Sequence, residues 1–235
     1  MTHALIACYL TTHHVFVLLN PLGTDHLIAK ALAEEAAECA GVLCLPFVAF
    51  GVSFYHKQFW GTISISPRAF KEYVKEACLS LSYFGIEKIV IVNGHGGNLA
   101  ALVDMARELR GKGVFVSIFQ WWPATAKPLP DLFKPEERGH ACAEETSVNL
   151  ALHPEIVDMD KAVDEAPRES MLRSEGIMLP LGTVDYTASG VFGKSTTASA
   201  EKGKMVLEAA VRELVKHVNL LQKAKIEDLM QKPKS

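Results

Sequence analysis

Three short strings of the sequence combine carboxylate, imidazole and glycine residues where a strand is expected to give way to a helix. They are GTDH at 23–26, NGHGGN at 93–98 and HACAEETS at 140–147. Ligands of open α/β sheets bind beyond the carboxyl ends of the strands, where glycine lets the backbone approach closely. Carboxylates and neutral imidazoles are the usual protein ligands of Zn²⁺ and Mn²⁺. The strings therefore predict the outline of a metal site at one rim of a sheet, where a metal-held hydroxide could attack a carbonyl.

Each string also has a simpler interpretation. Asp25 could be a helix cap, His95 a structural histidine in a glycine turn, and Glu144 with Glu145 a complement to a helix dipole. Phosphate binding is a weaker interpretation of the glycine string, because the string has neither the GxGxxG spacing nor the lysine of a P-loop. A nucleotide-binding α/β protein that uses this string stays open as a further function.

Short strands and helices alternate along the chain, which is typical of an α/β sheet with crossover helices. Helical spacing of apolar residues, together with caps and glycine stops, predicts helices at 24–39, 66–84, 98–109, 144–152 and 200–223. Short apolar runs predict strands at 42–47, 88–93 and 113–119, with a functional loop at 123–138 and a loose stretch of turns at 161–199. We expect a single domain over 1–235, a layered α/β/α fold with a mostly parallel central sheet, and a frayed tail at 224–235.

The composition excludes several classes of function. The chain of 235 residues has 24 Lys and Arg against 27 Asp and Glu, so neither nucleic acid nor an anionic membrane surface is an expected partner. No apolar run approaches the roughly 20 residues that cross a bilayer, and the N-terminus does not have the pattern of a signal peptide. The five cysteines form no CxxC pair, which favours reduced thiols. We therefore expect a cytoplasmic protein.

The chain resembles the creatininase family of metal-dependent amidohydrolases in strings that follow the family's order. They are PLGTD at 21–25, GVS at 51–53, FWGT at 59–62, NGHGGN at 93–98, HACAEETS at 140–147, GVFG at 190–193 and ASAEKG at 198–203. The resemblance implies a creatininase-like layered α/β fold and two divalent metal ions, Zn, Mn or Fe. It implies hydrolysis of a non-peptide C–N bond, in a small cyclic amide or formamide, by a hydroxide that bridges the metals. It also implies a homo-oligomer, often a hexamer.

Carried over by position, the resemblance gives roles to single residues. Asp25 looks like the carboxylate that bridges both metals, while His95 and Glu145 look like terminal ligands. His140 is similar to the histidine that moves protons during amide cleavage. Three more residues, His56, Trp121 and Trp122, match places that face the substrate in family members. The two tryptophans are expected at the end of a strand. His56 could equally be a hydrogen-bonded structural group.

The N-terminal segment departs from the family pattern. Family members precede PLGTD with Glu-x-His-Gly-x-His, whose Glu and first His are metal ligands, and these places fall on His14 and Phe16. Phe16 cannot bind a metal, whereas His14 can. Residues 1–20 are therefore an atypical segment, either natural or read in a shifted frame, and the site could hold two metals or one. The alternative function is a degenerate member with an incomplete metal site that acts as a non-catalytic binding protein or subunit.

Overall fold

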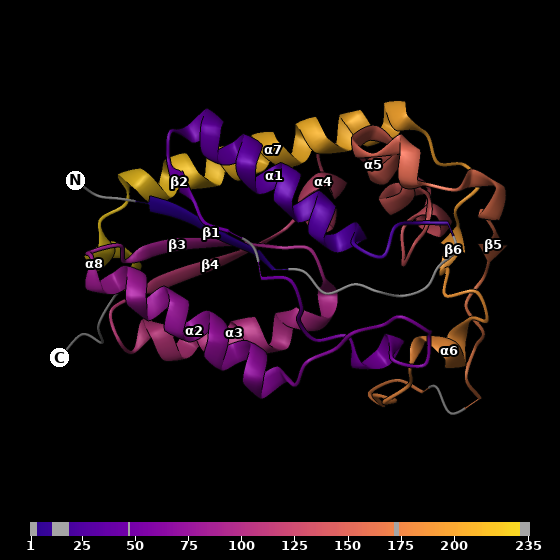
Figure 1. Ribbon diagram of the computed structural model, residues 1–235, viewed down its shortest axis with the longest axis horizontal. Coiled ribbons are helices and arrows are strands. Elements are labelled where there is room, and N and C mark those ends of the chain that lie inside the picture. The colour runs from indigo at the N-terminus through magenta and orange to yellow at the C-terminus, as the bar shows by residue number, and fades with distance from the viewer. Residues whose placement is uncertain (1–3, 11–18, 47, 172–173, 231–235) are drawn as a thin grey trace.

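The centre of the fold is a parallel sheet of four strands in the order β2-β1-β3-β4 (Figure 1). A computed structural model describes residues 4–10, 19–46, 48–171 and 174–230. The strands are β1 (Ala4–Leu10), β2 (Leu43–Cys44), β3 (Lys88–Asn93) and β4 (Phe115–Gln120). Because all three strand pairs are parallel, their carboxyl ends lie at one edge of the sheet. The NGHGGN string begins at that edge, with the last residue of β3.

Helices cover both faces of the sheet and make a three-layered fold (Figure 1). One face carries α1 (Thr24–Ala40), α5 (Ala143–Leu152) and α7 (Ala200–Lys223), and the other carries α2 (Pro67–Tyr83) and α3 (Leu99–Arg110). Val90 and Val92 of β3 pack into the first core, whereas Ile89 and Ile91 pack into the second. All four are fully buried, as expected for a strand covered on both faces. The expected α/β/α class is confirmed, and none of the described helices is long and apolar enough to cross a bilayer.

Local signals set the ends of the main helices. Ser66 caps α2 because its hydroxyl accepts a hydrogen bond from the backbone N–H of Ala69, and Pro67 occupies the first turn. The hydroxyl of Ser199 caps α7 in the same way by accepting from Lys202. The predicted bounds of α7 and β3 agree with the structure, and those of the other long helices agree within one or two residues.

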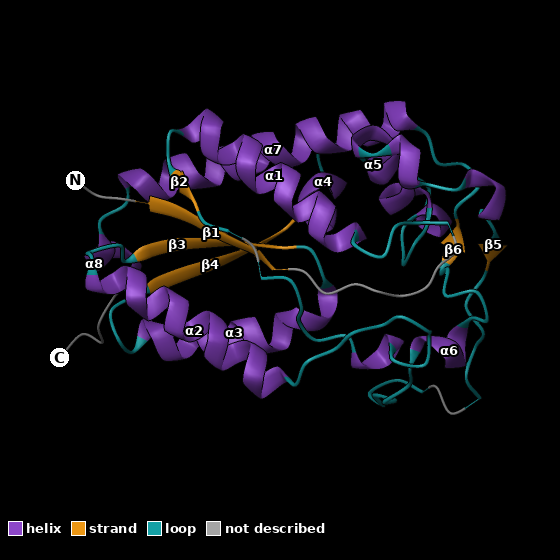
Figure 2. Cartoon of the chain, viewed as in Figure 1, coloured by secondary structure: helices purple, strands orange, loops and turns teal. Residues whose placement is uncertain are grey.

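Three short elements gather at one end of the molecule, beyond the carboxyl edge of the sheet (Figure 2). They are α6 (Thr183–Tyr186) and the antiparallel pair β5 (Asp164–Glu165) and β6 (Gly193–Lys194). The carboxylate of Glu165 accepts hydrogen bonds from the backbone N–H groups of Ala188 and Ser189. Side chains rather than a ladder of strands therefore shape much of the loose stretch at 161–199.

Two expected segments are shorter or more regular than predicted. The strand expected at 42–47 is reduced to Leu43–Cys44, since Pro46 has no N–H to donate to a ladder. The loop expected at 123–138 begins inside α4 (Trp121–Ala126) and contains a 3₁₀ turn at Pro135–Glu137. Pro123 is tolerated because the first turn of a helix leaves its N–H groups unpaired in any case.

Both ends of the chain also need correction. Residues 1–20, to which we assigned no element, contain β1, which lies between β2 and β3 in the sheet. The tail expected to fray from residue 224 contains a short helix, α8 (Ile226–Leu229). The buried ammonium of Lys88 holds the turn between α7 and α8, because it donates to the carbonyls of Leu221, Gln222 and Ala224. A basic group at the last carbonyls of α7 also complements the helix dipole.

Replacing Gly203 by Ala is expected to destabilise the fold by roughly 2–3 kcal/mol, because a methyl group there has no space. A Cβ on Gly203 would lie 1.9 Å from the carbonyl oxygen of Ser147, where α7 crosses α5. Urea unfolding measures the change, with the exposed Lys204→Ala on the same helix as control, expected to stay within about 0.5 kcal/mol. Equal stability of Gly203→Ala and the wild type would show that the two helices do not approach this closely.

Candidate active site

A cavity of about 550 Å³ opens beyond the carboxyl edge of the sheet. Its lining comes from the start of α1, the 3₁₀ turn Phe54–His56, the loop after β3, the start of α4, the segment 138–145 and the segment 181–192. Of the eight residues to which the resemblance gave a role in the site, seven line the cavity, and they are Asp25, His56, His95, Trp121, Trp122, His140 and Glu145. His14, the eighth, lies outside the described residues, as does Phe16.

Two carboxylates and one imidazole form the centre of the cavity. Asp25 Oδ2 lies 3.0 Å from His95 Nδ1, and both side chains are buried. Asp25 also shares a hydrogen bond with the carboxyl group of Glu145. Burial raises the pKa of Asp25 well above its usual value, and burial together with the nearby Asp25 raises the pKa of Glu145 to about 7. Two buried carboxyl groups in contact therefore hold a proton between them when no cation balances their charge.

Glycine allows this approach at two positions of the NGHGGN string. A Cβ on Gly94 would lie 2.3 Å from the carbonyl oxygen of Asp25, so only glycine lets the loop after β3 meet the start of α1. A Cβ on Gly97 would lie 2.2 Å from the carbonyl oxygen of Val52 and 2.7 Å from His95 Nε2. The glycines thus serve the close packing of backbone that brings His95 to Asp25.

The asparagines of the same string fix the backbone around His95. Asn93 Nδ2 donates to the carbonyl of His95 at 2.7 Å, and Asn98 Nδ2 donates to Asn93 Oδ1 at 3.1 Å. Asn98 Oδ1 in turn accepts from the backbone N–H of Val52 at 2.9 Å. On the other side of the ring, His95 Nε2 lies 3.3 Å from the hydroxyl of Tyr55. Burial lowers the pKa of His95 to about 4, so its imidazole is neutral at pH 7, as a metal ligand must be.

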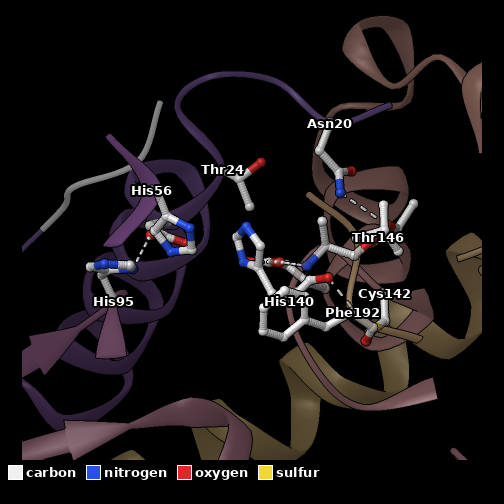
Figure 3. Close-up of polar contacts among 12 residues, drawn as sticks. Asn20, Thr24, His56, His95, His140, Cys142, Thr146 and Phe192 are labelled. Carbon is white, nitrogen blue, oxygen red and sulfur yellow. Dashed lines mark hydrogen bonds and ion pairs between the residues drawn. The ribbon is translucent and has the colours of Figure 1, made fainter. Parts of the chain in front are cut away.

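A second set of polar side chains ties the start of α1 to α5 (Figure 3). Asn20 Nδ2 donates to the hydroxyl of Thr146 at 2.9 Å, and Asn149 Nδ2 donates to the hydroxyl of Thr24 at 3.0 Å. Thr24 precedes Asp25, and Thr146 follows Glu145. These hydrogen bonds between distant segments therefore place the two carboxylates against each other. Asn20, Thr146 and Asn149 were not predicted from the sequence as part of the site.

His140 and His56, both in the lining of the cavity, form a stacked pair (Figure 3). Their ring centroids are 4.4 Å apart at an interplanar angle of 29°. His140 Nδ1 lies 4.0 Å from Glu145 Oε2, and the hydroxyl of Thr183 lies 2.6 Å from His56 Nδ1. Burial lowers the pKa of both histidines, and the nearby imidazoles lower them further. The pair is therefore neutral at pH 7, and His140 can accept a proton.

The turn between His140 and α5 has an unusual backbone. Ala141 adopts a left-handed conformation with φ of 52°, which is uncommon for a residue other than glycine. Its N–H donates to Glu145 Oε2 at 2.7 Å. This strained turn holds the Glu145 carboxylate and sets the direction in which His140 leaves the helix, an arrangement found at many functional sites.

The two tryptophans form an aromatic wall, although not at the end of a strand as expected. They open α4 directly after β4, with their rings 5.7 Å apart and nearly perpendicular. Trp121 is buried, and Trp122 is partly exposed. Beside them, Arg138 Nη1 donates to Glu144 Oε1 at 2.9 Å, and both residues belong to the lining. The sequence alone indicated for Glu144 only a complement to the helix dipole.

Asp25, His95 and Glu145 have the donor chemistry that divalent cations bind. Asp25 contacts both His95 and Glu145, and the described residues contain no group of three or more His, Cys, Asp or Glu side chains arranged around a common centre. The donors therefore fit a divalent cation in type, while their shell within the described part of the chain is partial.

Comparison with known proteins identifies relatives that cover most of the chain. A family model described as creatininase (creatinine amidohydrolase) matches residues 19–218. The mycofactocin precursor peptide peptidase of Mycobacterium ulcerans is 33% identical in an alignment of length 209 that covers 84% of this chain and 78% of the relative. The creatinine amidohydrolase of Pseudomonas putida is 30% identical in an alignment of length 209 that covers 81% of this chain and 79% of the relative. A solved manganese form of creatininase shares the fold with a TM-score of 0.78 at 24% identity, over 94% of this chain and 92% of that one.

Proposed function

The chain belongs to the creatininase family of hydrolases, and from this premise we propose that it is a metal-dependent amidohydrolase that cleaves a C–N bond in a small amide. The observation that carries the proposal is one cavity in which Asp25, Glu145 and His95 meet beside a neutral His140. The manganese form of a related fold supports the use of divalent ions. Zn, Mn and Fe are the candidate metals, as two ions or one.

The residues divide the work of hydrolysis between them. Asp25, His95 and Glu145 would hold the metal, which supplies polarisation of the amide carbonyl and a lowered pKa of water. His140 is neutral at pH 7, so it takes a proton from the attacking water and delivers it to the departing nitrogen. His56 stacks on His140 and is itself held by Thr183, which keeps the His140 ring in place during the transfer.

The aromatic wall positions the substrate. Trp121 and Trp122 close one side of the cavity, where a planar amide can pack against an indole ring and exclude water. The relatives differ in what their names say they act on, creatinine in one case and a precursor peptide in the other. A small cyclic amide or a formamide is the substrate class we propose for this chain.

A second candidate rests on the ligand shell. Phe16 stands at one of the two N-terminal ligand places, and the described residues hold no complete group of three metal-binding side chains. A chain with an incomplete site would keep the fold and bind a ligand or partner without hydrolysing it. Metal content separates the two candidates, because the enzyme needs a stably bound ion.

Elemental analysis of protein purified with Zn²⁺ and Mn²⁺ present is expected to find a stoichiometric divalent ion, near two per chain if His14 completes the shell. Creatinine, formamides and short peptides are then tested for hydrolysis before and after chelation, and activity should be lost with the metal and return with it. A well-folded chain that retains no metal and hydrolyses none of them supports the non-catalytic candidate instead.

We further propose that the protein is cytoplasmic and forms a homo-oligomer, with a hexamer as the expected form. The homo-oligomer is supported by three large apolar side chains that are exposed in the segment before α2, namely Phe54, Trp60 and Ile63. Exposed apolar side chains of this size can be covered by a second chain. No nucleic acid and no membrane is proposed as a partner.

A further inference from the structure

The GVFG string at 190–193 lies against His140. The backbone N–H of Phe192 donates to the carbonyl of His140 at 2.8 Å, and Cys142 Sγ donates to the carbonyl of Phe192 (Figure 3). The ring of Phe192 meets the ring of His140 at nearly a right angle, with the two centroids 6.1 Å apart. A Cβ on Gly139 would lie 2.4 Å from the carbonyl oxygen of Phe192, so glycine permits this close approach. Phe192 therefore contacts both the backbone and the ring of His140.

The carboxylate of Glu165 holds the turn that precedes Phe192. Its Oε1 accepts a hydrogen bond from the backbone N–H of Ala188 at 2.7 Å, and its Oε2 accepts from the backbone N–H of Ser189 at 2.9 Å. The hydroxyl of Ser189 also donates to Oε2. In the sheet, Glu165 of β5 is paired with Gly193 of β6. One residue therefore holds the chain on both sides of Phe192.

Glu165 itself lies outside the lining of the cavity, whereas Phe192 and His140 belong to it. Burial opposes ionisation of Glu165, yet the hydrogen bonds from Ser189 and Ala188 keep its pKa below the usual value. The group is therefore a carboxylate at neutral pH, and hydrogen bonds to a charged acceptor are the stronger kind. A substitution of Glu165 removes no side chain from the cavity, so it acts on the site through the turn.

We propose that Glu165 is a positioning residue, which fixes the ring of His140 through the turn at 188–192. The position of an imidazole matters when it takes a proton from one atom and delivers it to another, because a misplacement of about 1 Å can cost about 10²-fold in rate. The fixed ring is a property of the folded chain, whereas its use in proton transfer rests on the proposed function. Two different measurements therefore test them.

Asp164, the neighbour of Glu165 in β5, provides a matched control. Its carboxylate accepts hydrogen bonds from the backbone N–H groups of Ser195 and Thr196, at 3.0 and 3.1 Å. It thus holds the turn that follows β6 rather than the turn that precedes Phe192. Asp164→Ala and Glu165→Ala each remove a carboxylate of the same strand that accepts from two backbone N–H groups, so a general loss of stability should be similar in both.

The position of the His140 ring is measured by NMR of isotope-labelled histidine in protein purified with Zn²⁺, with His140→Gln to assign the signal. The signal should keep its shift and width in Asp164→Ala, and it should move or broaden in Glu165→Ala because the ring samples more than one position. Glu165→Gln keeps one oxygen of the two and should show a smaller change, which also serves if Glu165→Ala does not fold. An unchanged signal in the Glu165 variants, or an equal change in Asp164→Ala, would overturn the proposal.

Hydrolysis then tests what the fixed ring does. Glu165→Ala is expected to lower kcat by about tenfold or more, to leave KM within about twofold and to retain the metal, while Asp164→Ala keeps kcat within about twofold. In the His140→Gln background, Glu165→Ala should have no further effect on kcat, because the ring that it positions is gone. A full tenfold loss in that background would overturn the proposal. A wild type that hydrolyses nothing but shows the NMR difference would support the fixed ring and contradict only the proposed function.

Discussion

Replacing Asp25 by Asn is expected to lower kcat by about 10³-fold or more and to remove the bound metal. Asp25 is the donor that contacts both of the others, through His95 Nδ1 at 3.0 Å and through the shared hydrogen bond with Glu145. An amide keeps the shape of the side chain but offers one neutral oxygen in place of two charged ones. The loss of kcat is measured with a substrate that the wild type hydrolyses, and the loss of metal is measured as metal content per chain.

The same substitution is expected to leave the metal-free protein at least as stable as the wild type at pH 8. Burial raises the pKa of Asp25 in the folded chain, so the folded state holds this proton more tightly than the unfolded state. The stability that Asp25 contributes is therefore fully present below its unfolded pKa and is lost as the pH rises through the folded value. Asn carries no charge to bury, and it escapes that loss.

Thermal unfolding of the metal-free wild type and of metal-free Asp25→Asn, at pH 5 and at pH 8, measures the predicted difference in stability. The gap between Asp25→Asn and the wild type should move in favour of the variant as the pH rises. The exposed Asp160→Asn is the control and should change neither activity nor stability. Retained activity in Asp25→Asn, or a variant that melts well below the wild type at pH 8, would contradict the assignment of Asp25 to a buried metal site.

Elements with strong local signals could be predicted from the sequence. The Ser66–Pro67 pair starts α2, and Ser199 caps α7, because each signal lies within four residues of what it determines. The run at 88–93 could be predicted as a strand because its β-branched apolar residues suit a strand that is buried on both faces, as β3 is. By contrast, β1 is an apolar run, ALIACYL, with no Gly or Pro within it, and its place between β2 and β3 is set by pairing with distant residues.

The candidate site was likewise predicted in part, since its residues could be identified from local strings but the contacts that orient them could not. The structure brings Asp25, His95, Glu145 and His140 to one cavity as expected. The expected strand-to-helix junction is wrong for the last two, because they lie where the loop after α4 enters α5, while His95 directly follows β3. The bond between Thr183 and His56 joins residues 127 positions apart, and no spacing in the sequence predicts it. The pairing of Glu144 with Arg138 depends equally on the course of the loop that α4 begins, which the sequence analysis read as irregular.

Replacing His140 by Gln is expected to lower kcat by about 10²–10⁴-fold while the metal stays bound. Gln can fill the space beside His56 and accept a hydrogen bond, but it cannot carry a proton from water to a leaving nitrogen. The loss should depend on the substrate, because a weakly basic leaving nitrogen needs less protonation. Among formamides that the enzyme hydrolyses, those of weakly basic anilines should therefore lose less rate than those of alkylamines.

The pH profile gives this prediction a second readout. Burial lowers the pKa of His140 below its usual value of 6.5, so the wild type should lose activity only as the pH falls through that lowered value. His140→Gln should lack this acid limb, since the residue that gains the proton is gone. The partly exposed His153→Gln is the control and should keep both rate and profile. Equal losses for every leaving group, together with loss of metal, would show that His140 is a ligand rather than the group that transfers the proton.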